Sequence, residues 1–94
     1  MDEYEKIMSR YKKCKVLLID DLFKGNITLS DINIMFEIVN YRYFNNLPMI
    51  ISTEKGGEDL IKIDEAIGSR ILEMAKDYNM ELKGGKLNYR IYGK

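Results

Sequence analysis

The fold is decided by the stretch Val16-Leu17-Leu18-Ile19-Asp20-Asp21, in which four apolar residues lead directly into two adjacent carboxylates. A short apolar run of this kind predicts a strand buried on both faces, as in a parallel sheet covered by helices. The two carboxylates then lie at the carboxyl end of the strand, where open α/β sheets bind their ligands. Such a pair suits nucleotide hydrolysis, because one carboxylate holds magnesium and the second orients the attacking water.

The composition favours one small domain with a core of its own. The 94 residues are 46% hydrophobic and 32% charged, and 15 basic residues balance 15 acidic ones. We therefore expect no global attraction to nucleic acid or to an anionic membrane. The chain has no histidine, which excludes imidazole bases, and its single cysteine, Cys14, excludes an internal disulfide. The acidic start and the short apolar runs predict a cytoplasmic protein without a membrane span.

Hydrophobic periodicity predicts the first half of the fold. Tyr4, Ile7, Met8 and Tyr11 recur at helical spacing, which indicates an amphipathic helix over residues 2–13. A strand over 14–20 follows directly. A second helix, capped by Thr28 or by Ser30, is expected to extend to about residue 45.

The second half repeats the alternation of strand and helix. Residues 49–52 are expected to form another buried strand, followed by a short helix over 58–63 and a longer one over 64–78. Residues 80–82 and 87–92 predict a β-hairpin around the glycines between them. The order implies an α/β fold whose first two strands run parallel, joined by a right-handed crossover.

Neither glycine pair has the residues of a phosphate-binding loop. Gly56-Gly57 is followed by the acidic pair Glu58-Asp59, which would repel phosphate. Gly84-Gly85-Lys86 lacks both the upstream glycine and the Ser or Thr that would hold magnesium. Both pairs are interpreted as turns, so the chain offers the acidic part of a nucleotide site without a phosphate cradle.

Five segments, taken in order, resemble a known protein family. They are Leu17-Leu18-Ile19-Asp20-Asp21-Leu22, Phe36-Glu37-Ile38-Val39-Asn40-Tyr41-Arg42-Tyr43, Leu47-Pro48-Met49-Ile50-Ile51-Ser52-Thr53-Glu54, Asp64-Glu65-Ala66-Ile67-Gly68-Ser69-Arg70-Ile71 and Leu87-Asn88-Tyr89-Arg90. Nearly the whole chain resembles the carboxyl-terminal half of the AAA+ ATPase domain of bacterial replicative helicase loaders of the DnaC/DnaI type. It is also similar to the IstB transposition ATPases, and it looks closest to loaders from Gram-positive bacteria or their phages.

The resemblance implies a fold. Residues 1–94 would form a single partial AAA+ ATPase domain, a three-layer P-loop NTPase fold of the additional-strand type. It would have parallel Walker B and sensor-1 strands, flanking helices and a C-terminal β-hairpin. In the family the P-loop strand lies beside the sensor-1 strand, and this chain lacks the P-loop. We therefore expect the open sheet edge at residues 49–52 to be covered by the C-terminal hairpin or by a second copy of the chain.

The resemblance also implies roles for individual residues. Asp20 and Asp21 match the Walker B pair, with Asp20 toward magnesium and Asp21 toward the lytic water. Thr53 and Glu54 match the sensor-1 tip, although many relatives carry Asn there and a carboxylate repels phosphate. Arg70 matches an arginine that reaches the nucleotide of a neighbouring subunit.

Two further arginines, Arg42 and Arg90, match family positions without an assigned chemistry. Structural ion pairs are one interpretation. A nucleic-acid surface, with nearby tyrosines stacking on bases, is the other.

Two functions of different class follow. The first is a fragment of a helicase loader, a primosome component of DNA replication. The intact domain would bind ATP and Mg²⁺, whereas this chain alone is expected to bind no cofactor and to lack ATPase activity. Its partners would be the replicative helicase, other loader subunits and, in the intact protein, single-stranded DNA. The alternative is a non-catalytic interaction or regulatory module that binds intact loader or helicase subunits. A homo-oligomer formed through the exposed sheet edge is expected.

Overall fold

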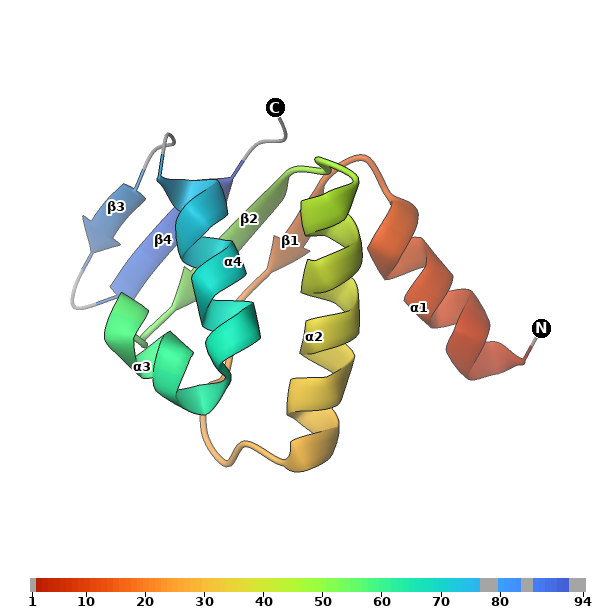
Figure 1. The fold of residues 1–94 in the computed structure, drawn as a ribbon, viewed down its shortest axis with the longest axis horizontal. Helices are drawn as coiled ribbons and strands as arrows, with labels where there is room; N and C mark the ends of the chain where they lie inside the picture. Colours follow the sequence, from red (N-terminus) through yellow and green to blue (C-terminus); the bar gives the residue numbers. More distant parts are fainter. Residues whose placement is uncertain (1, 77–79, 84–85, 92–94) are drawn as a thin grey trace.

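The computed structural model describes residues 2–76, 80–83 and 86–91 of the chain. Helices and strands alternate along its first half, after which two helices and then two strands follow (Figure 1). In chain order they are α1 (Glu3–Lys13), β1 (Leu17–Ile19), α2 (Leu29–Phe44), β2 (Met49–Thr53), α3 (Gly57–Ile63), α4 (Glu65–Ala75), β3 (Met80–Lys83) and β4 (Lys86–Ile91).

The four strands form one mixed sheet in the order β1-β2-β4-β3. β1 runs parallel to β2, with Leu17 beside Met49. β4 runs antiparallel to β2 and pairs Tyr89 with Ile51, and β3 runs antiparallel to β4. Of the two expected ways of covering the edge at residues 49–52, the structure therefore shows the one that uses the C-terminal strands.

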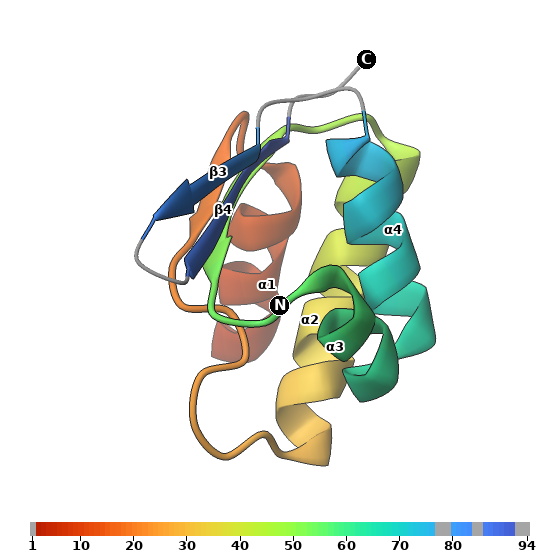
Figure 2. The same ribbon diagram turned by 90° about the vertical axis from the view of Figure 1, so that its left-hand side faces the viewer.

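The expected three-layer P-loop NTPase fold is wrong for this chain. Helices α2, α3 and α4 lie over one face of the sheet, and within the described residues no helix covers the opposite face (Figure 2). Strand burial agrees with this arrangement, because Leu17 is buried whereas Leu18 is 68% exposed. The chain forms a small two-layer domain, and its 94 residues are too few to build the third layer.

The same burial pattern corrects the interpretation of the stretch 16–19 as a strand buried on both faces. Val16 is 52% exposed and lies before β1, which is shorter than predicted. A strand has apolar side chains on both faces when helices cover both sides of its sheet. It can also have them when one face is covered only after another molecule binds there. Composition alone does not distinguish these two cases.

The core lies between the sheet and helices α2 to α4. Its apolar side chains without measurable exposure are Val39, Met49, Ile51, Leu60, Ile67 and Ile71. Within the described residues, every helix is too short or too polar to span a bilayer.

Arg42 is the largest fully buried side chain among the residues whose burial the structure describes, and it joins three parts of the fold. Its guanidinium donates hydrogen bonds of 2.6 to 3.3 Å to the carbonyl groups of Tyr11, Lys12, Cys14, Lys15 and Pro48. These acceptors belong to the end of α1, the segment before β1 and the residue just before β2. Among the described residues Arg42 forms no ion pair. Its role is structural, and it is carried by hydrogen bonds to main-chain carbonyl groups. A cation at the end of α1 is also favoured by the helix dipole.

We expect Arg42→Lys to lower the free energy of unfolding by about 3 kcal/mol, because a compact ammonium group cannot reach both ends of this set of carbonyls and leaves buried acceptors unpaired. Urea denaturation followed by circular dichroism measures the loss. Lys62→Ala, an exposed change on α3, serves as the control and should have little effect. Equal stability of the two variants would contradict the structural role of Arg42.

Gly68 permits the close packing of α4 on α3. A Cβ atom at this position would lie 2.6 Å from the backbone nitrogen of Ile61 and 2.8 Å from the carbonyl carbon of Leu60. Because the neighbouring atoms belong to the main chain, they cannot move aside as a flexible side chain would. The glycine is therefore required by helix packing, although glycine is a poor helix former.

Gly68→Ala should destabilise the protein by about 1–3 kcal/mol through overpacking, despite the better helix propensity of alanine. Gly56→Ala is the matched control, because a Cβ there would meet no atom within 4 Å. Thermal unfolding should show a lower midpoint for the first variant and little change for the second. A midpoint unchanged by Gly68→Ala would show that the two helices separate easily.

Candidate functional site

The acidic strand tip is formed by a sharp turn after β1. Asp21 and Phe23 have φ angles of 53° and 58°, in the left-handed region that non-glycine residues rarely adopt. Such a conformation costs about 1–3 kcal/mol and persists only where the surroundings hold it. Leu22 and Phe23 are buried, which anchors the turn in the core. Asp20 remains exposed and Asp21 half-buried beside them.

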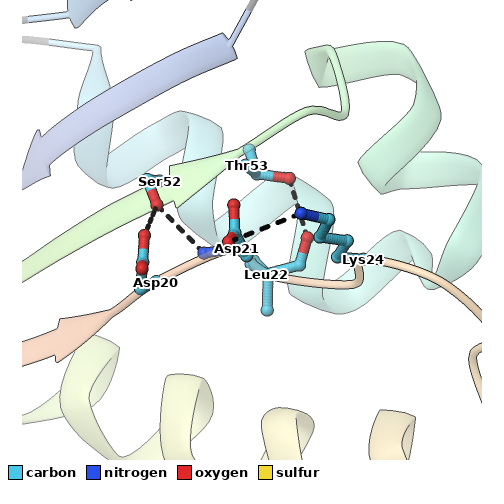
Figure 3. A network of polar contacts seen from close by, with 6 residues as sticks. All are labelled: Asp20, Asp21, Leu22, Lys24, Ser52 and Thr53. Atoms are coloured by element: carbon cyan, nitrogen blue, oxygen red, sulfur yellow. Dashed lines mark hydrogen bonds and ion pairs between the residues drawn. The ribbon is translucent and has the colours of Figure 1, made fainter.

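Ser52 joins both aspartates to β2 (Figure 3). Its hydroxyl donates a 2.5 Å hydrogen bond to Oδ1 of Asp20 and accepts one of 2.9 Å from the backbone N–H of Asp21. Because β1 and β2 are parallel, their carboxyl ends meet at one edge of the sheet. The structure thus brings the predicted pair Asp20 and Asp21 together with a serine that the sequence interpretation did not assign.

The register of the two strands identifies Ser52 as the neighbour of Asp20. Ile19 pairs with Ile51, so the next residues, Asp20 and Ser52, face each other across the two strands. The sequence alone does not set this register, because a shift of one residue would preserve the apolar character of both strands.

Asp21 also forms an ion pair. Its Oδ2 lies 3.9 Å from Nζ of Lys24, and both side chains are partly exposed. A pair of this kind contributes little to stability in water. The positive charge of Lys24 nevertheless offsets part of the negative charge of Asp20 and Asp21.

The two predicted sensor-1 residues have different surroundings. Thr53 is fully buried, and its hydroxyl donates to the carbonyl of Leu22 at 2.9 Å and accepts from the N–H of Lys55 at 3.1 Å. The Thr53 hydroxyl therefore fastens the turn after β1 to the end of β2. Glu54 is exposed in the bend that follows β2. Only the second side chain is accessible to a ligand in this arrangement.

Arg70 is held by α2 rather than by the acidic tip. Its Cζ lies 5.6 to 5.7 Å from the ring centroids of Phe36, Tyr43 and Phe44, and its Nη1 donates to the carbonyl of Ala66 at 3.3 Å. These contacts hold Arg70 against α2 and against its own helix. The structure does not bring this predicted site residue to the others.

Tyr43 connects the same cluster to α4. Its hydroxyl donates a 2.7 Å hydrogen bond to Oε2 of Glu73. This hydrogen bond raises the pKa of the Tyr43 phenol, because it favours the protonated form and places a carboxylate beside the oxygen. Desolvation adds to the rise, and the charge of Arg70 opposes it.

A hollow of about 340 Å³ opens beside the acidic tip, between β1, the loop that follows it and α2. Its apolar lining includes Ile27, Ile34 and Met35, and its polar lining comprises Asp20, Asp21, Lys24, Asn26 and Asp31. Among the described residues no group of three or more His, Cys, Asp or Glu side chains is placed to hold a metal ion. A magnesium ion at Asp20 would therefore need ligands from another segment, from a nucleotide or from water.

Comparison with known proteins finds similarity to two proteins of Bacillus subtilis (strain 168). The chain is 42% identical over 93 residues to the phage-like element PBSX protein XkdC, covering 92% of this chain and 35% of that protein. It is 38% identical over 97 residues to the uncharacterized protein YqaM, covering 96% of this chain and 31% of that protein. The chain spans about a third of the length of these curated relatives. No family model matches it, and no solved structure matches it significantly.

Arg70→Ala should lower the free energy of unfolding by about 1–2 kcal/mol, because the guanidinium lies over three aromatic rings. Ser69→Ala, an exposed change one residue earlier on α4, should have little effect. Chemical denaturation of both variants provides the comparison. Unchanged stability of the Arg70 variant would mean that the aromatic contacts do not hold the arginine, which would leave it free to reach a neighbouring molecule.

Proposed function

We propose that this chain supplies the acidic, water-orienting part of an ATP-dependent helicase loader of DNA replication and does not hydrolyse ATP alone. The observation that supports the proposal most directly is the position of Asp20 and Asp21. Together with Ser52 they occupy the carboxyl ends of two neighbouring parallel strands, the location at which α/β sheets bind ligands.

In this proposal the two carboxylates have different roles. Ser52 orients Asp20 through Oδ1, and the second oxygen of Asp20 would hold Mg²⁺, directly or through water. Asp21 would orient the attacking water, with Lys24 beside it to moderate its charge. The metal would neutralise the charge that develops on the transferred phosphoryl group.

The phosphate-binding residues would come from outside this stretch. The chain has no glycine-rich phosphate loop, and carboxylates alone repel a triphosphate. Its relatives extend well beyond the matched third, so they have room for such a loop. The name of one relative, a phage-like element protein, is compatible with a phage-type loader. The intact protein would then act in the cytoplasm with a replicative helicase, other loader subunits and single-stranded DNA.

A second candidate is a non-catalytic module that binds intact loader or helicase subunits. Two contacts favour it. The hydroxyl of Thr53 is used inside the chain, and Arg70 lies against aromatic rings of α2 instead of being extended.

The 94-residue chain should show no saturable binding of a fluorescent ATP analogue with magnesium.

In the protein encoded by the complete reading frame, Asp20→Asn and Asp21→Asn should each reduce Mg²⁺-dependent ATP hydrolysis about 100-fold or more, because each removes a group that acts on the metal or the water. Asp64→Asn is the matched control, because Asp64 is the N-cap of α4, asparagine is an equally good N-cap, and this side chain does not line the hollow.

The outcomes separate the two candidates. Micromolar nucleotide binding by the isolated chain would contradict the claim that it lacks a phosphate site. Full ATPase activity of the Asp20 and Asp21 variants would overturn the ATPase proposal. Absence of hydrolysis in the complete protein, even with a helicase and single-stranded DNA present, would favour the interaction module.

A further inference from the structure

Helix α1 leaves most of its apolar side uncovered. Met8 is buried against the core, whereas Tyr4, Ile7 and Tyr11 are 53%, 41% and 45% exposed. These three residues recur at i, i+3 and i+7, so they lie on one side of the helix. α1 lies beside α2 at the outer end of the domain (Figure 1). In an amphipathic helix such a stripe normally packs against a core. Here no other part of the described chain covers it.

Opposite charges lie at the two ends of this stripe. Glu3, Ile7 and Arg10 are spaced by four and three residues, which places them in one row along α1. Glu3 and Arg10 are exposed, and among the described residues neither forms an ion pair within its own chain. The row thus reads negative, apolar and positive from the beginning of the helix to its end.

We propose that a second copy of the chain packs on this face, with the two α1 helices antiparallel about a twofold axis. In that arrangement Glu3 of each copy meets Arg10 of the other, and Ile7 lies near the axis between the two pairs. A twofold contact requires a surface that is complementary to itself, and this row meets the requirement. A parallel arrangement would place like charges together.

The helix dipole alone accounts for only part of the pattern. Acidic residues near the beginning and basic residues near the end favour any isolated helix. They do not explain why Tyr4, Ile7 and Tyr11 remain exposed on the same side of the helix. A contact between helices of 11 residues is smaller than a standard interface, so we expect a dimer that dissociates on dilution.

Charge exchange across the contact tests the proposal with the 94-residue chain. Sedimentation velocity should show a mass that rises toward the dimer with concentration. Ile7→Asp should remain monomeric over the same range. Glu3→Arg and Arg10→Glu should each weaken self-association at least tenfold, because each places like charges together at both pairs. Leu29→Ser, an exposed apolar residue of α2, is the control and should dimerise as the original chain does.

Restoration of the contact is the decisive measurement. An equimolar mixture of the Glu3→Arg and Arg10→Glu variants should form a mixed dimer, and the double variant Glu3→Arg/Arg10→Glu should recover self-association. Circular dichroism establishes that each variant is folded, and a variant that fails this check is replaced by Glu3→Gln or Arg10→Gln. A chain that stays monomeric at all concentrations, or swaps that are not rescued by mixing, would overturn the antiparallel α1 contact.

Discussion

The buried guanidinium of Arg42 is the interaction on which the rest of the structure depends. Its donors bind the carbonyl of Pro48, just before β2, and the main chain that leads from α1 into β1. The N–H of Leu17 also donates to Pro48, so the two parallel strands begin side by side at this point. Once their starting points are fixed, their ends are fixed as well. Asp20 lies opposite Ser52 because an arginine at the other end of the strands sets the register.

The acidic tip is more ordered than two exposed carboxylates would be by themselves. Ser52 holds Asp20, Thr53 fastens the turn through Leu22, and burial of Phe23 anchors the turn in the core. In the proposed ATPase function these oriented carboxylates would hold a metal ion and a water, as phosphoryl transfer requires. The same contacts use the Thr53 hydroxyl, so the described part of the chain contains an oriented acidic group without a complete set of ligands. This is why the proposed ATPase function depends on another segment.

Local features of the fold could be predicted from the sequence, and features that depend on what covers a surface could not. Thr28 was one of two predicted caps for α2, and it forms a capping box with Asp31. Leu18 shows the limit, because an apolar residue in a strand reveals nothing about whether a second layer of helices is present. The three-layer expectation was wrong for this reason. The candidate site divides in the same way. The aspartate pair follows a recognisable apolar run, whereas the partner of Asp20 depends on strand register and the environment of Arg70 depends on how α4 packs against α2.

The left-handed backbone at Phe23 places two opposing demands on one position. The torsion angles favour glycine, while the pocket that the ring fills favours a large apolar side chain. No natural amino acid satisfies both, so any substitution at this position either keeps the torsional penalty or loses the buried ring. Asp20 and Asp21 lie in the same turn, just before Phe23. A change in the core residues that pack against Phe23 would therefore reorient the two carboxylates, even if neither aspartate were substituted.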